Sequence, residues 1–288
     1  MDWLNAVLQG VLLGGLYALF AAGLSLIFGV MRLVNVAHGD LVVLGAYLAL
    51  VVVQTLGIGP FTAALIVVPL MAGFGYALQR LLLNVTLGKD LLSPLLVTFG
   101  LSVIIQNGLL TVFSADSQRL PAGPIETASI GLGNGIGVGV LPLMMFAAAV
   151  AVIAGLELLF ARTSLGRAFR ATSDDAEIAQ LMGLDNRHVF AMAMALSAAI
   201  VALAGIFLAV RANFDPASGP SRLIFGFEAV IIGGLGSLWG TLAGGIVLGI
   251  AQALAAQIDP GFQILAGHLV FFLILTLRPR GLFPRMDG

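Results

Sequence analysis

The sequence predicts an all-α protein that crosses a membrane several times. Of its 288 residues, 60% are hydrophobic and 9% are charged, whereas soluble domains carry roughly 25% charged residues. Apolar runs of roughly 18 or more residues recur along the chain, and each is long enough to cross a bilayer as a helix. The 37 glycines fit this class, because small residues let helix backbones approach each other in lipid.

Apolar stretches predict seven spans directly and two more from one long stretch. The stretch 225–258 would measure ~51 Å as one helix, which is too long for one crossing. Its middle reads GGLGSLWGTLAGG, so we expect a break near residues 236–240 and two short spans. The total is about eight to nine transmembrane helices, since part of this stretch could instead form a re-entrant hairpin. The other spans are 3–30, 40–56, 60–83, 91–113, 140–160, 189–210 and 262–277.

Basic residues predict the orientation of these spans. The first segment has an acid and no basic residue before its apolar run, which indicates a retained span with the N-terminus outside. Nine crossings then put ten Lys and Arg residues inside and only Arg119, Arg211 and Arg222 outside, as the positive-inside rule expects. The C-terminus is therefore expected in the cytoplasm. Four spans, one linking span and four spans also indicate an inverted repeat within a single transmembrane domain, residues 1–288.

Two of the segments between the spans stand out by their length and polarity. Residues 114–139 form a polar, glycine-rich external loop, and long loops often contact partners or ligands. Residues 161–188 form a charged cytoplasmic loop. In this loop Asp174 and Glu177 have the spacing of a capping box with Asp174 as N-cap, and Gly183 fits the end of a helix of about eight residues. Asp185 is expected to cap the next span.

The short helix in the cytoplasmic loop has one apolar stripe. Ile178, Leu181 and Met182 fall at positions i, i+3 and i+4, which places them on one face. A helix this short is marginal in water by itself. The stripe therefore packs either on this protein's own helix ends or in a groove of another protein.

The sequence VNVAHGDLVVLG at residues 34–45 puts three polar residues between two apolar runs. One interpretation is a turn at the inner surface, where Gly39 allows the reversal and Asn35 or Asp40 caps a helix end. The other, which follows from the family resemblance given below, is a broken-helix turn that dips into the bundle and brings Asn35 and His38 near a transport path. We keep both interpretations, and Asp40 is a path candidate with them.

Five further residues are candidates for a path or gate. Gln106 and Asn107 lie in mid-span, where amides either join helices by hydrogen bonds or line a polar path. Glu228 lies near the start of the predicted span at Phe225 and is expected near an outer gate. Gly233 and Gly236 either expose backbone along a path or allow a tight helix crossing.

Residue types argue against catalysis by this chain. There is no cysteine, which excludes disulfides and thiol chemistry, and no His–carboxylate cluster suggests a metal site. No nucleophile elbow or phosphate-binding G-x-x-x-x-G-K-[ST] motif occurs, so any ATP is expected to be hydrolysed by another chain. An ion-coupled secondary transporter is the remaining alternative, although the spans carry little charge for ion coupling.

Four stretches together resemble one family. They are GLYALFAAGLSLIFGVMRLVNVAHGD, GRAFRATSDDAEIAQLMGLDNRHVFAMAMALSAAIVALAGIFLA, IIGGLGSLWGTLAGGIVLGI and LRPRGLF. Their order and content are similar to the Liv-type permeases of branched-chain amino-acid ATP-binding-cassette (ABC) importers, over essentially the whole chain.

The resemblance implies a permease subunit in a bacterial inner membrane. It implies pairing with a second homologous permease or a copy of itself, with two cytoplasmic ATPases that carry ATP and Mg, and with an external solute-binding protein. No nucleic acid and no cofactor on this chain are expected. Branched-chain amino acids are the implied substrates, and urea or short amides are the alternative within the family. In the family the coupling segment sits in a cleft on the ATPase, which implicates Gly166, Arg167, Arg170, Ala176, Glu177 and Gly183.

Overall fold

The computed structural model describes residues 2–86, 92–133 and 136–283, and it confirms the all-helical membrane fold. Within these ranges eight helices are long and apolar enough to cross a membrane. The last of them, α11, reaches that length together with the 3-10 turn Pro260–Phe262 before it. The eight are α1 (Asp2–Met31), α2 (His38–Leu56), α3 (Pro60–Leu81), α4 (Leu92–Phe113), α5 (Val140–Arg162), α8 (Asn186–Arg211), α10 (Leu238–Ile258) and α11 (Gln263–Leu277).

Shorter elements connect these helices. Two 3-10 turns, Leu83–Val85 and Gly123–Glu126, follow α3 and α4. The loop 114–139 ends in an antiparallel hairpin of β1 (Ser129–Gly133) and β2 (Ile136–Gly139), in which Ile130 pairs with Val138. Three short helices complete the chain: α6 (Ser164–Asp174), α7 (Ala176–Leu181) and α9 (Gly219–Gly233).

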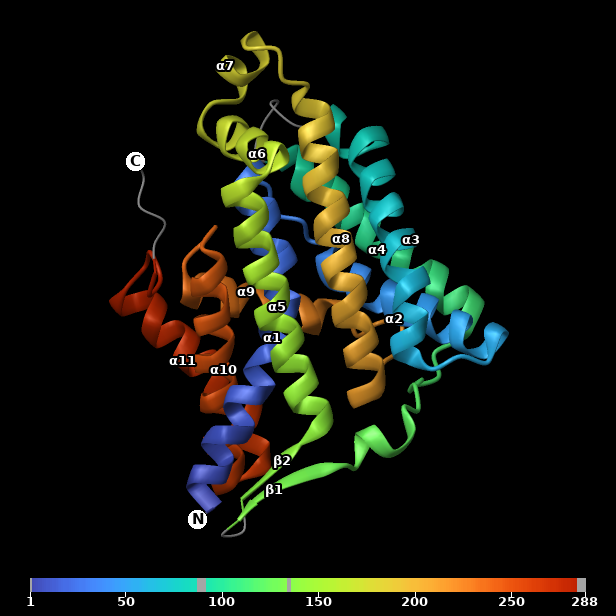
Figure 1. Ribbon diagram of the computed structural model, residues 1–288, viewed down its shortest axis with the longest axis vertical. Helices are drawn as coiled ribbons and strands as arrows, with labels where there is room; N and C mark the ends of the chain where they lie inside the picture. Colours follow the sequence, from blue (N-terminus) through green and yellow to red (C-terminus); the bar gives the residue numbers. More distant parts are fainter. Residues whose placement is uncertain (1, 87–91, 134–135, 284–288) are drawn as a thin grey trace.

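Two long helices, α1 and α8, run in opposite directions through the middle of the bundle (Figure 1). Helix α1 packs most extensively on α10, and α8 packs most extensively on α3. Helices α6 and α7 project from one end of the bundle, whereas the hairpin and the start of α1 lie at the opposite end (Figure 1). Most of α11 is exposed on the periphery, with apolar side chains facing outward as a bilayer requires.

The contacts between helices fit the inverted repeat. Each central helix is followed by a non-helical segment, a helix that begins inside the protein, and then a full span. Helix α1 packs on α9 and α10, and α8 packs in the same way on α2 and α3. The first helix of each half thus packs on the second and third helices of the other half. This reciprocal packing is expected between two halves of opposite orientation.

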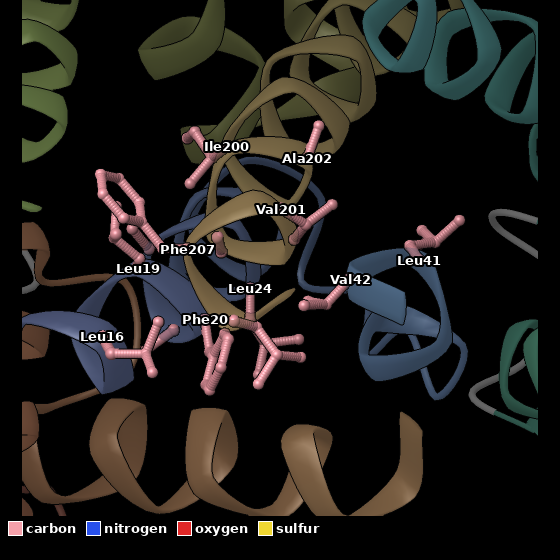
Figure 2. Close-up of a cluster of buried hydrophobic side chains, with 14 of the residues drawn as sticks. Leu16, Leu19, Phe20, Leu24, Leu41, Val42, Ile200, Val201, Ala202 and Phe207 are labelled. Carbon is pink, nitrogen blue, oxygen red and sulfur yellow. The ribbon is translucent and has the colours of Figure 1, made fainter. Parts of the chain in front are cut away.

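The buried core lies where α1, α2 and α8 meet. Figure 2 shows side chains from the three helices interleaved there, including Phe20 of α1, Val42 of α2 and Phe207 of α8. Because lipid is as apolar as these side chains, close packing rather than escape from water holds such helices together.

The predicted break in 225–258 is confirmed, but its boundaries differ from the prediction. Helix α9 ends at Gly233 and α10 begins at Leu238. Gly234 and Gly236 between them have φ of 110° and 78°, which glycine adopts without strain. The expected pair of short spans is found only in part. Helix α9 is short, with 15 residues that begin at Gly219 rather than Phe225, whereas α10, at 21 residues, is a full span. A non-helical segment, 212–218, carries the chain into the protein before α9 starts.

Glycines set the spacing between α1 and α10. A Cβ added to Gly14 would lie 2.5 Å from the Cα of Ile246, and one on Gly10 would lie 2.6 Å from the Cα of Ile250. Both clashes are with backbone, so the helices themselves would have to separate.

We therefore expect Gly14→Ala to destabilise the folded protein by about 1–3 kcal/mol, the usual cost of overpacking. The measurement is thermal inactivation followed by fluorescence-detected size exclusion in detergent. Gly108→Ala in α4 is the matched control, because a Cβ there meets nothing within 4 Å. Equal loss of stability in both variants would contradict the tight α1–α10 crossing.

Candidate functional site

Residues 32–37 return into the protein after α1 ends. Arg32 has a φ of 52°, a value uncommon for residues other than glycine, and it marks the reversal. His38, at the start of α2, places Nε2 2.8 Å from the carbonyl oxygen of Phe20. Phe20 lies about 16 Å along α1 from its end at Met31, at roughly 1.5 Å per residue. The structure thus has the broken-helix turn that dips into the bundle.

The expected capping by Asn35 or Asp40 is wrong. The N-cap of α2 is Ala37, and it makes no side-chain cap bond. Asn35 instead folds back on the loop, because its Oδ1 accepts a hydrogen bond from the Ala37 N–H at 3.0 Å. The N–H of Val36 donates to Thr98 Oγ1 of α4 at 3.2 Å. These bonds satisfy two backbone N–H groups that would otherwise lack a partner inside the bilayer.

Asp40 joins three elements in the interior. Its Oδ1 accepts a hydrogen bond from Gln106 Nε2 at 2.9 Å, and the same amide lies 3.0 Å from Ser102 Oγ of α4. The carboxyl group also abuts Gly219, the first residue of α9. A carboxylate is favoured beside a helix N-terminus, where the unpaired N–H groups carry partial positive charge. Asp40 is 1% exposed, so it links the starts of α2 and α9 to α4.

Several polar atoms around this junction keep unused hydrogen-bonding capacity. His38 and Ser197 face each other across Gly23, because a Cβ on Gly23 would lie 2.9 Å from His38 Cε1 and 2.7 Å from Ser197 Oγ. A buried polar group without a partner costs about 1–3 kcal/mol. Such groups are able to bind a polar solute or water. Within the described chain the buried atoms that lack a partner include Asn35 Nδ2, His38 Nδ1, Asp40 Oδ2 and Ser197 Oγ.

The two mid-span amides have different positions. Gln106 points inward to Asp40, as described above. Asn107 is exposed on α4, and its Nδ2 donates to the Val103 carbonyl of the same helix at 2.8 Å. Only Gln106 therefore belongs to the junction.

Glu228 lies in the interior rather than at an interface, which corrects its expected position. It is 4% exposed and sits in the middle of α9, because that helix begins six residues before Phe225 at Gly219. Its Oε1 contacts Nδ1 of His268 on α11, and its Oε2 has no partner within the described residues. Nothing in the local sequence pattern of either residue signals this pairing.

The two glycine candidates have separate roles. Gly233 packs against the backbone of Gly240, so it allows the tight α9–α10 turn. Gly236 lines a cavity of about 380 Å³ between α1, α5, α6 and that turn. Polar groups on the cavity wall come from Ser25, Glu157, Arg170, Ser237 and Trp239.

Helix α7 is capped at both ends. Its N-cap is Asp175, whose Oδ1 accepts from the N–H groups of Glu177 and Ile178, both at 2.9 Å. The expected N-cap Asp174 is wrong by one residue, because Asp174 is still helical and ends α6. Gly183 has a φ of 92° and closes the helix as expected, although α7 has six residues rather than about eight.

The apolar stripe of α7 is left exposed by the described residues of this chain. Ile178, Leu181 and Met182 are 58%, 87% and 81% exposed, whereas Ala179 on the opposite face is buried. Exposed apolar side chains grouped on one face, outside the spans, mark an interaction surface. We call Ile178, Leu181 and Met182 the α7 stripe.

The residues implicated by the family resemblance divide into two sets. Gly166 is buried against the backbone of Phe160, and Arg170 donates to the Phe160 carbonyl, so both fix α6 to the end of α5. Ala176 is half-buried and its carbonyl accepts from Asn186 Nδ2 at the start of α8. The exposed set is Arg167, Glu177 and Gly183.

Asp185 joins the loop to α8, as expected from the sequence. Its Oδ1 accepts from the N–H groups of Arg187 at 3.0 Å and His188 at 3.2 Å. The His188 N–H, together with Arg80 at 3.3 Å, holds the pKa of Asp185 below its usual value. The cap is therefore a carboxylate at neutral pH and weakens only as acid protonates it.

Comparison with known proteins gives one consistent result. Residues 6–277 match the model of the family described as branched-chain amino acid transport system / permease component. The chain is 29% identical to the branched-chain amino acid transport permease BraD of Pseudomonas aeruginosa, over 99% of this chain and 97% of the relative. It is 27% identical to LivH of Escherichia coli (99% and 96%) and 29% identical to LivM of Escherichia coli (93% and 68%). The chain therefore belongs to the family of branched-chain amino acid transport permease components.

Proposed function

We propose that this chain is the membrane subunit of an ATP-driven importer that moves branched-chain amino acids inward by alternating access. The observation that carries this proposal is the exposed α7 stripe. A permease that relies on a separate ATPase needs a surface on which that ATPase docks, and the stripe provides one. Family membership supplies the substrate class, because BraD, LivH and LivM are all named for branched-chain amino acid transport.

Four partners follow from this proposal. Two ABC ATPases, carrying ATP and Mg, dock in the cytoplasm on the loop 161–188. A solute-binding protein docks outside on the loop 114–139. A second permease, of the same or a homologous sequence, covers part of the exposed apolar surface in the bacterial inner membrane. Similarity to both LivH and LivM supports such a pair.

The contacts of the cytoplasmic loop suggest how force reaches the spans. Motion of α7 passes to α6, and Arg170 with Gly166 ties α6 to α5. Asp185 and Asn186 tie the other end of the loop to α8. Arg170 also forms part of the wall of the cavity beside the α9–α10 turn, so a shift of α6 changes that cavity. Non-helical segments beside α1 and α8 are the natural hinges for opening the path.

The overall proposal is tested by uptake of leucine into proteoliposomes that contain the complete complex. Uptake that requires ATP and the binding protein is the expected outcome. Uptake driven by an ion gradient without ATPases would favour a secondary transporter. Uptake of urea or short amides in place of leucine would favour the alternative substrates.

For the docking surface we expect the double variant Leu181→Asp, Met182→Asp to lose at least tenfold in uptake and in co-purification of the ATPase. Each apolar anchor contributes about 1.5–3 kcal/mol when buried by a partner, and both side chains are exposed in this chain. Folded yield should stay unchanged for that reason. Gln180→Asp, at an exposed residue of α7 on the side away from the stripe, is the control. Normal uptake by the double variant would reject the docking surface.

For the junction we expect His38→Ala to lose at least tenfold in uptake while most of the folded yield is kept. The ring makes one hydrogen bond, to Phe20, which is worth about 0.5–1.5 kcal/mol, whereas the unpartnered Nδ1 is available to the path. Asn107→Ala is the control, because that amide is exposed and bonds only within its own helix. A loss of yield without loss of uptake per folded molecule would assign His38 to the fold alone.

A further inference from the structure

We propose that Tyr17, Arg211, Arg222 and Glu228 form a site for the zwitterionic head group of an α-amino acid, with the arginines on the carboxylate and Glu228 on the ammonium. The proposal rests on amino-acid transport as the function of the chain, and it adds the residues that recognise the substrate within the permease.

Tyr17 is the fixed centre of this site. Its hydroxyl donates to Gln252 Oε1 of α10 at 2.5 Å, and Gln252 is 1% exposed. The Tyr17 ring packs on Phe225 of α9 with ring centroids 5.1 Å apart. A hydrogen bond to α10 and a ring contact with α9 hold the phenol in one orientation.

Charged groups of both signs act electrostatically on Tyr17. Arg211 ends α8 and Arg222 lies near the start of α9, and both interact electrostatically with Tyr17. Glu228, two turns further along α9, does so as well. Arg222, Phe225 and Glu228 recur every three residues along α9, so they lie on one side of that helix. Phe225 packs on Tyr17, which places this side of α9 against α1.

The arginines are not neutralised by ion pairs. Within the described chain, neither Arg211 nor Arg222 lies within 4.0 Å of a carboxylate oxygen. The buried Nε of Arg222 has no hydrogen-bond partner there. Asp215 acts on Arg222 only at longer range, and its Oδ1 accepts from the Ala217 N–H. Partly buried guanidinium groups without an anion are costly, and carboxylates are the anions that their paired N–H donors fit best.

Glu228, the acidic residue of the cluster, has an unused hydrogen-bond acceptor. Glu228 Oε2 is buried without a partner in the described residues, while Oε1 contacts His268. An ammonium group donates to such an oxygen. The rings of Tyr17 and Phe225 provide an apolar wall beside these charges. A zwitterion satisfies both sets of groups at once, whereas an uncharged amide or urea satisfies neither charge.

The test is equilibrium binding of radiolabelled leucine to the complete permease–ATPase complex in nanodiscs, without the solute-binding protein. Leucinamide, which lacks the carboxylate, and 4-methylpentanoate, which lacks the ammonium, serve as competitors. We expect leucine to compete at least tenfold better than either. Removal of one charged partner should weaken binding about 10- to 100-fold, so Arg211→Gln, Arg222→Gln and Glu228→Gln are the variants. Arg80→Gln, which removes an exposed arginine paired with Asp185 at the other end, is the control.

Thermal stability separates a binding role from a structural one. An arginine held for binding lacks a partner in the folded chain, so Arg222→Gln should leave the melting temperature equal or higher while it removes binding. A structural arginine would instead lose stability when replaced. Arg222→Lys keeps the charge and should restore part of the affinity.

Several outcomes would overturn the site. They are the absence of saturable leucine binding by the wild-type complex, equal competition by leucinamide, or normal binding and uptake in both arginine variants. Failure of the proposed function is distinct, since it would appear as no ATP-driven leucine uptake by the wild-type complex with its binding protein.

Discussion

A backbone that leaves the helix inside a bilayer has to find its hydrogen bonds within the protein, because lipid offers none. Two segments of this chain are under that constraint. Residues 32–37 are satisfied by Asn35 and by Thr98 of α4. In residues 212–218, the backbone of Phe214 pairs with that of Gln118 in the loop 114–139, and Asp215 Oδ1 accepts from the Ala217 N–H. Because both segments enter the protein, α2 and α9 begin in its interior. Polar residues of these two helices, such as His38, Asp40 and Glu228, are therefore buried.

Packing and polarity divide the molecule into stiff and adaptable parts. Backbone contacts at Gly10 and Gly14 bind α1 tightly to α10, and Gly75 does the same between α3 and α8. These pairs have no room to slide without separating. The junction around His38 and Asp40 and the cluster around Tyr17 instead retain polar atoms without partners. The α1–α10 and α3–α8 pairs are thus rigid, and the polar groups between them retain unused hydrogen-bonding capacity. Such an arrangement suits alternating access, in which rigid parts move against each other.

Much of the fold was predictable because the bilayer imposes few choices. Hydrophobic length predicted the spans, and glycine clustering predicted the break after Gly233. Local cap chemistry predicted Gly183 and Asp185, since those bonds involve neighbouring residues. The predicted N-cap of α7 was wrong by one residue, because Asp174 and Asp175 carry the same side chain and either is able to cap a helix. Only the extended backbone of Asp175, with φ of −151°, distinguishes them.

The sequence by itself determined the membrane class, the approximate bounds of most spans, and the short capped helix with its apolar stripe. Each of these depends on residues close together in the chain. Only the tertiary structure decided that residues 32–37 dip inward and that the α7 stripe stays exposed. It also decided that Glu228 of α9 meets His268 of α11 and that Tyr17 of α1 packs on Phe225 of α9. Those relations join side chains from helices far apart in sequence, and periodicity within one helix carries no information about which neighbour it will face.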